Sequence, residues 1–147
     1  YFRSEQVLVV NTASMYANAS SLSDFNGAGV IAQMSTLQDG LIDQITGVNH
    51  QTALGDYPSL VASLTSGVSD ALVAELPVAE SIIASNSGLT IVRLGEEGFT
   101  VDASDVSVSV AVRQEETDLL ESINTVLEGI SEETRNNWMT EALNRQP

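Results

Sequence analysis

Short apolar runs alternate with amphipathic helical segments through the middle of this chain, and no other feature constrains the fold as strongly. The apolar runs at 30–32, 68–74 and 89–94 have the length and composition of buried strands. The segments 36–45, 57–66 and 77–85 that separate them repeat apolar residues at helical spacing. This order is typical of a parallel sheet with right-handed helical crossovers. The sequence therefore predicts an α/β fold, a mostly parallel sheet flanked by helices, with its core at about 28–94.

Further elements are predicted on both sides of this core. A β-branched run at Val7–Val10 indicates a strand. The Ser- and Ala-rich segment 11–26 indicates a loop or short helix, and a linker between structural units is the alternative. Valines alternate with serine and alanine from Val106 to Val112, which predicts a strand with two distinct faces. Two helices, at about 117–130 and 132–144, close the chain. The first carries an apolar stripe made of Leu119, Leu120, Ile123, Leu127 and Ile130.

The charge balance and the absence of cysteine exclude several functions. The chain has 20 acidic residues against 5 basic ones, a formal net charge of -15. A surface of this sign repels nucleic-acid phosphates and anionic lipid, so neither is expected as a partner. Without cysteine there are no disulfides, zinc–thiolate sites or cysteine nucleophiles. No apolar run has the length of a transmembrane helix. The first residues lack the features of a signal peptide, so we expect the natural protein to extend upstream.

No pattern typical of catalysis or of metal binding is present in the sequence. His50 is the only histidine, and because no carboxylate pair is set for it we interpret it as a surface residue. The G-x-S-x-G nucleophile elbow is missing, and the acidic residues at 96–105 fit no calcium loop. Trp138 and Met139 on the last helix are interpreted as packing residues. We therefore predict no catalytic residues, no metal ligands and no cofactor, and we do not expect an enzyme.

The turn from Gln33 to Thr36 is the first candidate for a binding site. It follows a predicted buried strand and precedes a predicted helix, so it lies at the edge where open α/β sheets bind ligands. Ser35 and Gln38 have the S-x-x-Q spacing of a capping box, which predicts Ser35 as the N-cap. Free backbone N–H groups there, with the Ser35 and Thr36 hydroxyls, suit a carboxylate or a phosphate. A helix cap without a ligand is the open alternative.

Glu75 is the second candidate, because it ends the strand at 68–74 directly before the helix that Pro77 begins. The carboxyl ends of parallel strands share one edge, so we expect Glu75 on the side of Ser35 and Thr36. A carboxylate there can bind an ammonium group, and a solvated strand-end acid is the alternative. An anion site and a carboxylate at one edge match the two charges of a free α-amino acid. The nearby Tyr57 is interpreted as packing, with Asp56 as its N-cap.

Several stretches resemble the amino-acid-binding proteins of bacterial ABC importers, the family 3 solute-binding proteins. The matching stretches, in order, are YFRSEQVLVV, FNGAGVIAQMSTLQ, YPSLVASLTSGVSDALVAELPVA, VSVSVAVRQEETDLLESIN and NNWMTEA. That family has the periplasmic binding protein type II clamshell, in which two α/β lobes joined by two crossover strands close on the ligand. The resemblance implies that residues 1–113 form lobe two with the crossover strands, at Val7–Val10 and at the strand ending near Arg113. It implies that 114–147 are C-terminal helices that pack on lobe one, most of which this sequence lacks.

The resemblance also implies a set of ligand-binding residues. Thr36 matches the threonine whose backbone and hydroxyl hold the substrate α-carboxylate, and Ser35 and Ala32 flank it at positions that line the cleft. Glu75 matches the acid that receives the α-ammonium group. Met34 stands where glycine is usual in the family, so it is expected to narrow the cleft or to contact the substrate side chain.

The function implied is that of a receptor for a free amino acid, which it delivers to ABC permease subunits. The place implied is extracytoplasmic, in the periplasm or as a lipoprotein on the outer face of the membrane. Two other classes stay open: an enzyme on the same fold, such as a dehydratase of a small carboxylic acid with Glu75 as general acid or base, and a ligand-sensing receptor module. If the helices from 117 onward lack their lobe-one partner, their apolar stripe favours a homodimer or swapped assembly.

Overall fold

The computed structural model describes residues 2–143 and 145, and of Leu143 it describes the backbone alone. The chain divides into two compact units, one made of Glu5–Val101 and the other of Tyr1–Ser4 with Asp102–Pro147. Residues 102–113, which the sequence grouped with the first part, cluster here with the C-terminal helices. The assignment of 1–113 and 114–147 to two lobes stays a prediction.

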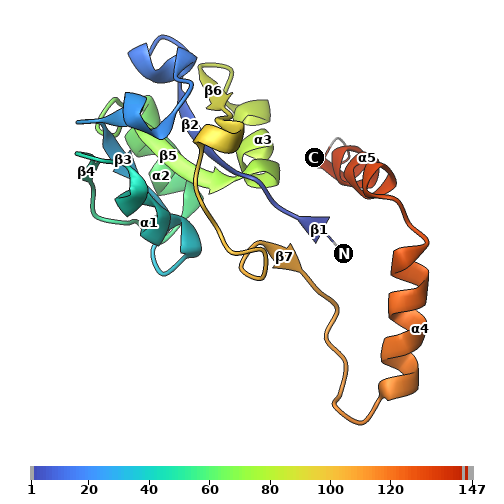
Figure 1. Cartoon of the computed structure of the whole chain (residues 1–147). Helices are drawn as coiled ribbons and strands as arrows, with labels where there is room; N and C mark the ends of the chain where they lie inside the picture. The colour runs from blue at the N-terminus through green and yellow to red at the C-terminus, as the bar shows by residue number, and fades with distance from the viewer. Residues whose placement is uncertain (1, 144, 146–147) are drawn as a thin grey trace. The chain divides into compact units, whose positions relative to one another are not determined.

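A five-stranded mixed sheet forms the centre of the Glu5–Val101 unit (Figure 1). Its strands, in spatial order, are β4 (Asn49–His50), β3 (Gly29–Ile31), β5 (Ala71–Glu75), β2 (Gln6–Asn11) and β6 (Leu89–Val92). Strand β3 pairs in parallel with both β4 and β5, whereas β2 is antiparallel to both β5 and β6. All these strands except β2 therefore run in one direction. The predicted α/β class and mostly parallel sheet are confirmed.

Two helices of this unit begin and end within one residue of the bounds that the sequence indicates. Helix α2 (Tyr57–Thr65) starts at Asp56, whose carboxylate accepts a 2.9 Å hydrogen bond from the backbone N–H of Ser59. It is followed by Gly67, which has the left-handed φ of +75° that favours glycine. Helix α3 (Leu76–Ser85) has its proline in the first turn, where the missing N–H is tolerated.

The predicted capping box at Ser35 and Gln38 is wrong. Helix α1 (Leu37–Leu41) has Thr36 as its N-cap, and a 3-10 helix, η3 (Ile42–Gln44), continues it. Ser35 has a φ of +64°, and this left-handed conformation is not the extended one that an N-cap residue requires. The Gln38 side chain turns inward instead and donates to Gln6 Oε1 at 2.8 Å.

The sheet separates two apolar clusters, because successive residues of a strand point to opposite faces. On one face Leu8 and Val10 pack with Phe25, Ile42 and Ile45, and on the other face Val7 and Val9 pack with residues of α2 and α3. The segment 11–26 forms two 3-10 helices, η1 (Met15–Asn18) and η2 (Leu22–Phe25). Phe25 is completely buried, and its ring stacks on Tyr16 with the centroids 5.2 Å apart. The prediction of short helical structure in this segment is therefore confirmed, and the alternative of a linker between structural units is wrong.

The other unit contains a short antiparallel ribbon and two helices. Strand β1 (Phe2–Arg3) pairs with β7 (Ser107–Val108). The predicted strand from Val106 to Val112 is thus correct for two residues only, because its partner strand β1 is itself only two residues long. A 3-10 helix, η4 (Gly95–Glu97), belongs to the Glu5–Val101 unit and precedes this region in the sequence.

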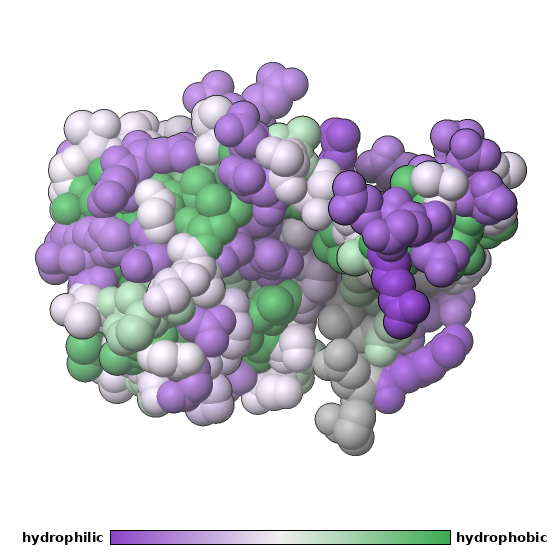
Figure 2. Space-filling view, turned by 90° about the horizontal axis from the view of Figure 1, so that it is seen from below, coloured by the Kyte–Doolittle hydropathy of each residue, from purple (hydrophilic) through white to green (hydrophobic). Residues whose placement is uncertain are grey.

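Helices α4 (Thr117–Glu128) and α5 (Glu132–Leu143) confirm the two predicted C-terminal helices, apart from residue 144, which lies outside the described residues. Helix α4 has no fully buried residue. In the predicted stripe Leu119 is 49% and Leu120 41% exposed, whereas Ile123, Leu127 and Ile130 are partly buried. Hydrophobic residues reach the visible surface among hydrophilic ones in Figure 2. Within the described residues, no helix is both long enough and apolar enough to span a bilayer.

Candidate functional site

The sheet places the two predicted site segments at one edge. Strands β3 and β5 are parallel neighbours, with Val30 opposite Ala71 and Ile31 opposite Leu72. The turn that leaves the carboxyl end of β3 and Glu75 at the carboxyl end of β5 therefore lie on the same side of the sheet, as predicted. We call this set, Met34–Gln38 with Gln6, Tyr57 and Glu75, the strand-end site.

Hydrogen bonds to the segment after β4 hold the turn in place. The backbone N–H of Met34 donates to the Leu54 carbonyl at 2.8 Å, and Gln33 Nε2 donates to the Gly55 carbonyl at 3.0 Å. Within the turn, the Thr36 hydroxyl donates to the Gln33 carbonyl at 2.7 Å. The proton of the Thr36 hydroxyl is therefore already in use, and the donors left for an anion are backbone groups.

The backbone N–H groups of Ser35 and Thr36 are those donors. Among the described residues neither group has a hydrogen-bond acceptor. Both residues are at least partly exposed, and Met34 beside them is 55% exposed. Ala32 differs, because it is completely buried and its side chain belongs to the core behind the turn.

The left-handed residue of the turn is Ser35 and not Met34. Glycine is favoured where φ is positive, and Ser35 is the only described non-glycine residue with a positive φ. The conformation that favours glycine therefore lies one residue after Met34, and the match of Met34 to the family's glycine stays a prediction. Met34 has ordinary backbone geometry and projects an exposed apolar side chain beside the free N–H groups.

Glu75 has a neighbour that the sequence did not reveal. The Tyr57 ring packs on the α2 and α3 side of the core, as its interpretation as a packing residue required. Burial also raises the pKa of the Tyr57 hydroxyl, and the negative charge of Glu75 raises it further. The phenol therefore keeps its proton at neutral pH within electrostatic reach of the carboxylate. No sequence pattern links these two residues, because the packing of α2 on the sheet brings them together.

A buried pair of amides completes the strand-end site. Gln6 is 9% and Gln38 6% exposed, and Gln6 lies directly opposite Glu75 in the antiparallel β2–β5 pair. Gln38 Nε2 donates to Gln6 Oε1, while Gln6 Nε2 is enclosed and has no partner in the described part of the chain. A glutamine at the start of an otherwise apolar strand was the one signal that could have indicated Gln6.

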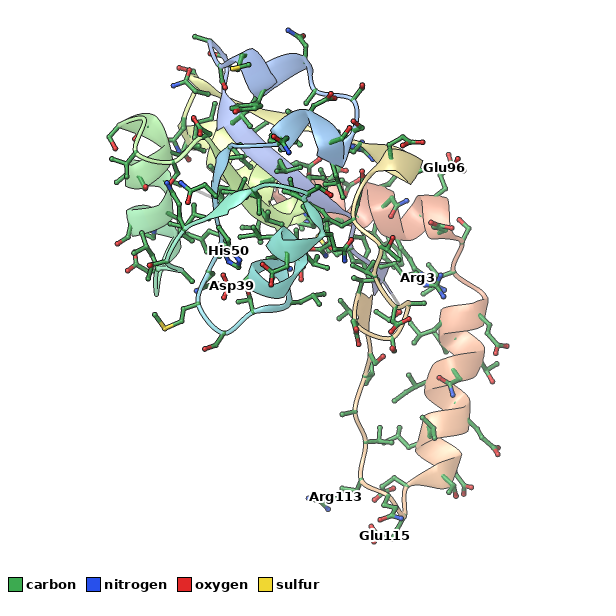
Figure 3. All side chains as sticks on the ribbon, turned by 60° about the vertical axis from the view of Figure 1, so that its left-hand side comes forward. Arg3, Asp39, His50, Glu96, Arg113 and Glu115 are labelled. Carbon is green, nitrogen blue, oxygen red and sulfur yellow. The ribbon has the colours of Figure 1, made fainter. Side chains whose placement is uncertain are left out.

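His50 has the carboxylate pair that the sequence did not show, so that part of its interpretation was wrong. Its Nε2 lies 3.0 Å from Asp39 Oδ1, and its Nδ1 lies 2.8 Å from Asp43 Oδ1; Figure 3 shows His50 and Asp39 side by side. The bond to Asp39 raises the pKa of His50 above its ordinary value, burial lowers it, and Asp43 raises it again. The carboxylates come from α1 and η3, and folding alone sets them around β4.

Other concavities lie in the unit that contains α4 and α5. A pocket of about 370 Å³ is lined by Phe2, Arg3, Ser107, Glu132, Arg135 and Asn136. An apolar pocket of about 210 Å³ includes Phe2, Leu127, Ile130, Trp138, Met139 and Ala142. Met139 is partly buried, as its predicted packing role requires, whereas Trp138 is 55% exposed, so its predicted packing role is not borne out. In the part of the chain that the structure describes, no three acidic, histidine or cysteine side chains gather as metal ligands.

Comparison by sequence gives no relative, since no protein-family model and no curated protein matches the chain. Comparison of structures gives many. An amino acid ABC transporter substrate-binding protein from Streptococcus pneumoniae, bound to L-arginine, matches with a TM-score of 0.73 and 23% identity over 98% of this chain. The truncated, arginine-bound ArgBP from T. maritima matches with a TM-score of 0.60 and 27% identity over 88% of it.

An ancestral arginine-binding protein bound to glutamine is also similar, with a TM-score of 0.62 and 25% identity over 97% of this chain. In these comparisons the chain spans 58%, 57% and 59% of the respective neighbours, which is less than two thirds of their length. The chain therefore has the fold of part of an amino acid ABC transporter substrate-binding protein, and the resemblance identified in its sequence is confirmed.

Proposed function

We propose that this chain belongs to the solute-binding component of an ABC importer and supplies one half of a cleft for a free amino acid. The observation that carries the proposal is the strand-end site. It sets two free backbone donors, at Ser35 and Thr36, at the same sheet edge as the carboxylate of Glu75. A zwitterionic α-amino acid has the complementary pair of groups.

In this proposal each group of the ligand has a partner. The α-carboxylate accepts from the N–H groups of Ser35 and Thr36, and the α-ammonium donates to Glu75. The exposed Met34 side chain contacts the ligand's side chain, and Ala32 supports the turn from the core. Helix α1 is only five residues long, so the individual N–H groups contribute more than a helix dipole.

The remaining steps of transport rest on the similarity of the fold. We propose that a second lobe closes on the ligand and that closure stabilises the ligand-bound population. The closed protein delivers its ligand to permease subunits outside the cytoplasmic membrane, in the periplasm or as a lipoprotein. Neighbours bound to arginine and to glutamine make these two amino acids the first ligands to try.

We propose no catalytic role for the strand-end site. Its structural neighbours are substrate-binding proteins. The one titratable partner that we identify beside Glu75 is Tyr57, whose raised pKa keeps it a hydrogen-bond donor. The dehydratase alternative requires turnover of a small carboxylic acid, and a sensory module requires a signalling partner; either finding would replace the transport proposal.

We also propose that the exposed stripe on α4 mediates self-association, because Leu119, Leu120 and Val126 leave a large apolar face in solvent. The same face would be covered by the rest of lobe one in a full-length protein. A second copy of this chain is the occupant we propose when that lobe is not present.

The deciding experiment is an NMR titration of the chain with pooled L-amino acids, followed by L-arginine and L-glutamine separately. We expect shifts at the amides of Met34–Leu37 and of Glu75, with millimolar affinity, because one half-site lacks the contacts of the other lobe. Glu75→Gln removes the ammonium's counter-charge and should weaken binding about 10-fold or more, as expected for a charged hydrogen bond. The matched control, Glu96→Gln, lies on exposed η4 and should bind like the wild type. Absence of shifts at high ligand concentration would contradict the proposal, as would equal binding by both variants.

A further inference from the structure

The Gln6–Gln38 pair is an unusual feature of the strand-end site, because it buries two amides where apolar residues would pack. Gln6 begins β2 and projects to the same face as Leu8 and Val10, beneath α1 and η3. Gln38 reaches it from α1, and a single 2.8 Å hydrogen bond joins them. Both side chains are more than nine-tenths buried.

The single bond leaves the buried Gln6 Nε2 group without an acceptor. An enclosed N–H without a partner costs free energy, and proteins seldom keep one unless it serves a purpose. The other free atom of the pair, Gln38 Oε1, is not enclosed in this way. The pair therefore has an unfavourable inner end at Gln6 and an accessible outer end at Gln38.

A primary amide occupies the same space when its oxygen and nitrogen exchange places, so the pair has two arrangements. In the one described, Gln38 presents its oxygen outward. In the inverted one, Gln6 Nε2 donates to Gln38 Oε1, and Gln38 Nε2 is free to donate outward. The inverted arrangement satisfies the enclosed N–H and leaves an enclosed carbonyl oxygen, which is tolerated more often than an unpaired N–H.

We infer that Gln6 is a positioning residue for carboxylate recognition. Gln6 holds the Gln38 side chain, and when a carboxylate is bound the amide pair adopts the inverted arrangement. Gln38 follows Thr36 by two residues, so its outward donor joins the N–H groups of Ser35 and Thr36 around one anion. The ligand's oxygen thereby extends the hydrogen-bond chain that begins at Gln6 Nε2. This inference rests on the proposed function, because the carboxylate is that of the amino acid.

The test is a double-mutant cycle on the same NMR titration, with Gln6→Leu, Gln38→Leu and the double variant. We expect Q6L to bind the amino acid about 3- to 10-fold more weakly and Q38L at least as weakly. The double variant should bind no more weakly than Q38L, because Gln6 acts through Gln38. The matched control is Gln114→Leu, an exposed loop position of the other unit, which should bind like the wild type.

Two further readouts separate positioning from a structural role. The double variant replaces both buried amides by apolar side chains, so its melting temperature should equal or exceed that of the wild type. The amino acid with its α-carboxylate converted to a primary amide should bind Q6L and the wild type equally. If Q6L unfolds, Gln6→Met provides a variant with a side chain of similar length. A further measurement needs no variant: the NMR signal of the Gln38 side-chain amide should shift when the wild type is titrated with the amino acid.

The outcomes distinguish the two proposals. Suppose that the wild type binds an amino acid. If Q6L then weakens the binding of the amino acid and of its amide derivative equally, or if the effects of Q6L and Q38L on binding are fully additive, the inference is wrong and the proposed function stands. If the wild type binds no amino acid at all, the proposed function is wrong and the inference is overturned with it.

Discussion

At the scale of single residues, the left-handed Ser35 gives the sharpest prediction. A φ of +64° disfavours any residue with a Cβ by roughly 1–2 kcal/mol, and glycine's greater chain entropy returns about 0.5–1 kcal/mol of that. Ser35→Gly should therefore raise the free energy of unfolding by about 0.5–1 kcal/mol. Denaturant unfolding measures this directly. The backbone N–H is retained, so ligand binding should persist.

A serine in ordinary helical geometry provides the control for Ser35. Ser81 lies exposed within α3, and there glycine should lower the free energy of unfolding by about 0.5 kcal/mol. Opposite signs for the two serine-to-glycine changes would support the left-handed turn. A loss of stability at both positions would show that the turn does not hold Ser35 with a positive φ.

These residues also show how far the sequence leads at this scale. The position of Glu75 and of the turn after β3 follows from strand order alone, because parallel strands bring their carboxyl ends to one edge. The roles of Gln6, Tyr57 and His50 do not follow from order. Each depends on a partner that packing supplies: Gln38 on α1 for Gln6, Glu75 for Tyr57, and two aspartates for His50.

At the scale of elements, His50 attaches the edge strand β4 to α1 and η3 and predicts a pH dependence. Both ring nitrogens face carboxylates, an arrangement that requires both to carry protons. Because the pKa of His50 is raised in the folded chain, its stabilisation is complete below the ordinary value of about 6.5 and is lost as pH rises through the folded value. Stability relative to His50→Gln should therefore fall between neutral and alkaline pH.

The size of this effect is limited by solvent. The Asp43 side chain is 75% exposed, so we expect at most about 1 kcal/mol. Unfolding by denaturant from pH 5.5 to pH 9, for the wild type and H50Q, measures the difference. A difference that is constant, or that grows with pH, would show that His50 is not held as an imidazolium.

Elements differ in how well a local pattern predicts them. Helices α2 and α3 were predicted because their caps, Asp56, Gly67 and Pro77, lie next to them in the sequence. The 106–112 strand was overestimated, because alternation shows what a strand would bury and not whether a partner strand exists. Helix α1 was located correctly and its cap was not, since the conformation of Ser35 depends on the bonds that anchor the turn.

At the scale of the whole molecule, two properties of the surface oppose each other. The formal net charge of -15 keeps copies of the chain apart, and the apolar side chains of α4 favour contact between them. Salt screens the first and leaves the second in place, because the Debye length falls to about 8 Å at physiological ionic strength. Self-association should therefore strengthen as salt is added, which is the reverse of an assembly held by ion pairs.

The prediction is that the chain forms a dimer through the apolar face of α4. Light scattering at high protein concentration should give twice the monomer mass of 15.6 kDa, with a larger dimer fraction in 0.5 M than in 0.05 M salt. Leu120→Glu places a charge in the apolar face and should shift the chain to monomer. Thr125→Glu adds the same charge at an exposed polar position on the opposite side of the same helix and should leave the dimer in place. A monomer at every concentration would contradict the prediction. An unpaired charge in a buried apolar contact carries a desolvation penalty that a charge at an exposed position does not. A dimer that persists in L120E would therefore show that the interface lies elsewhere on the chain.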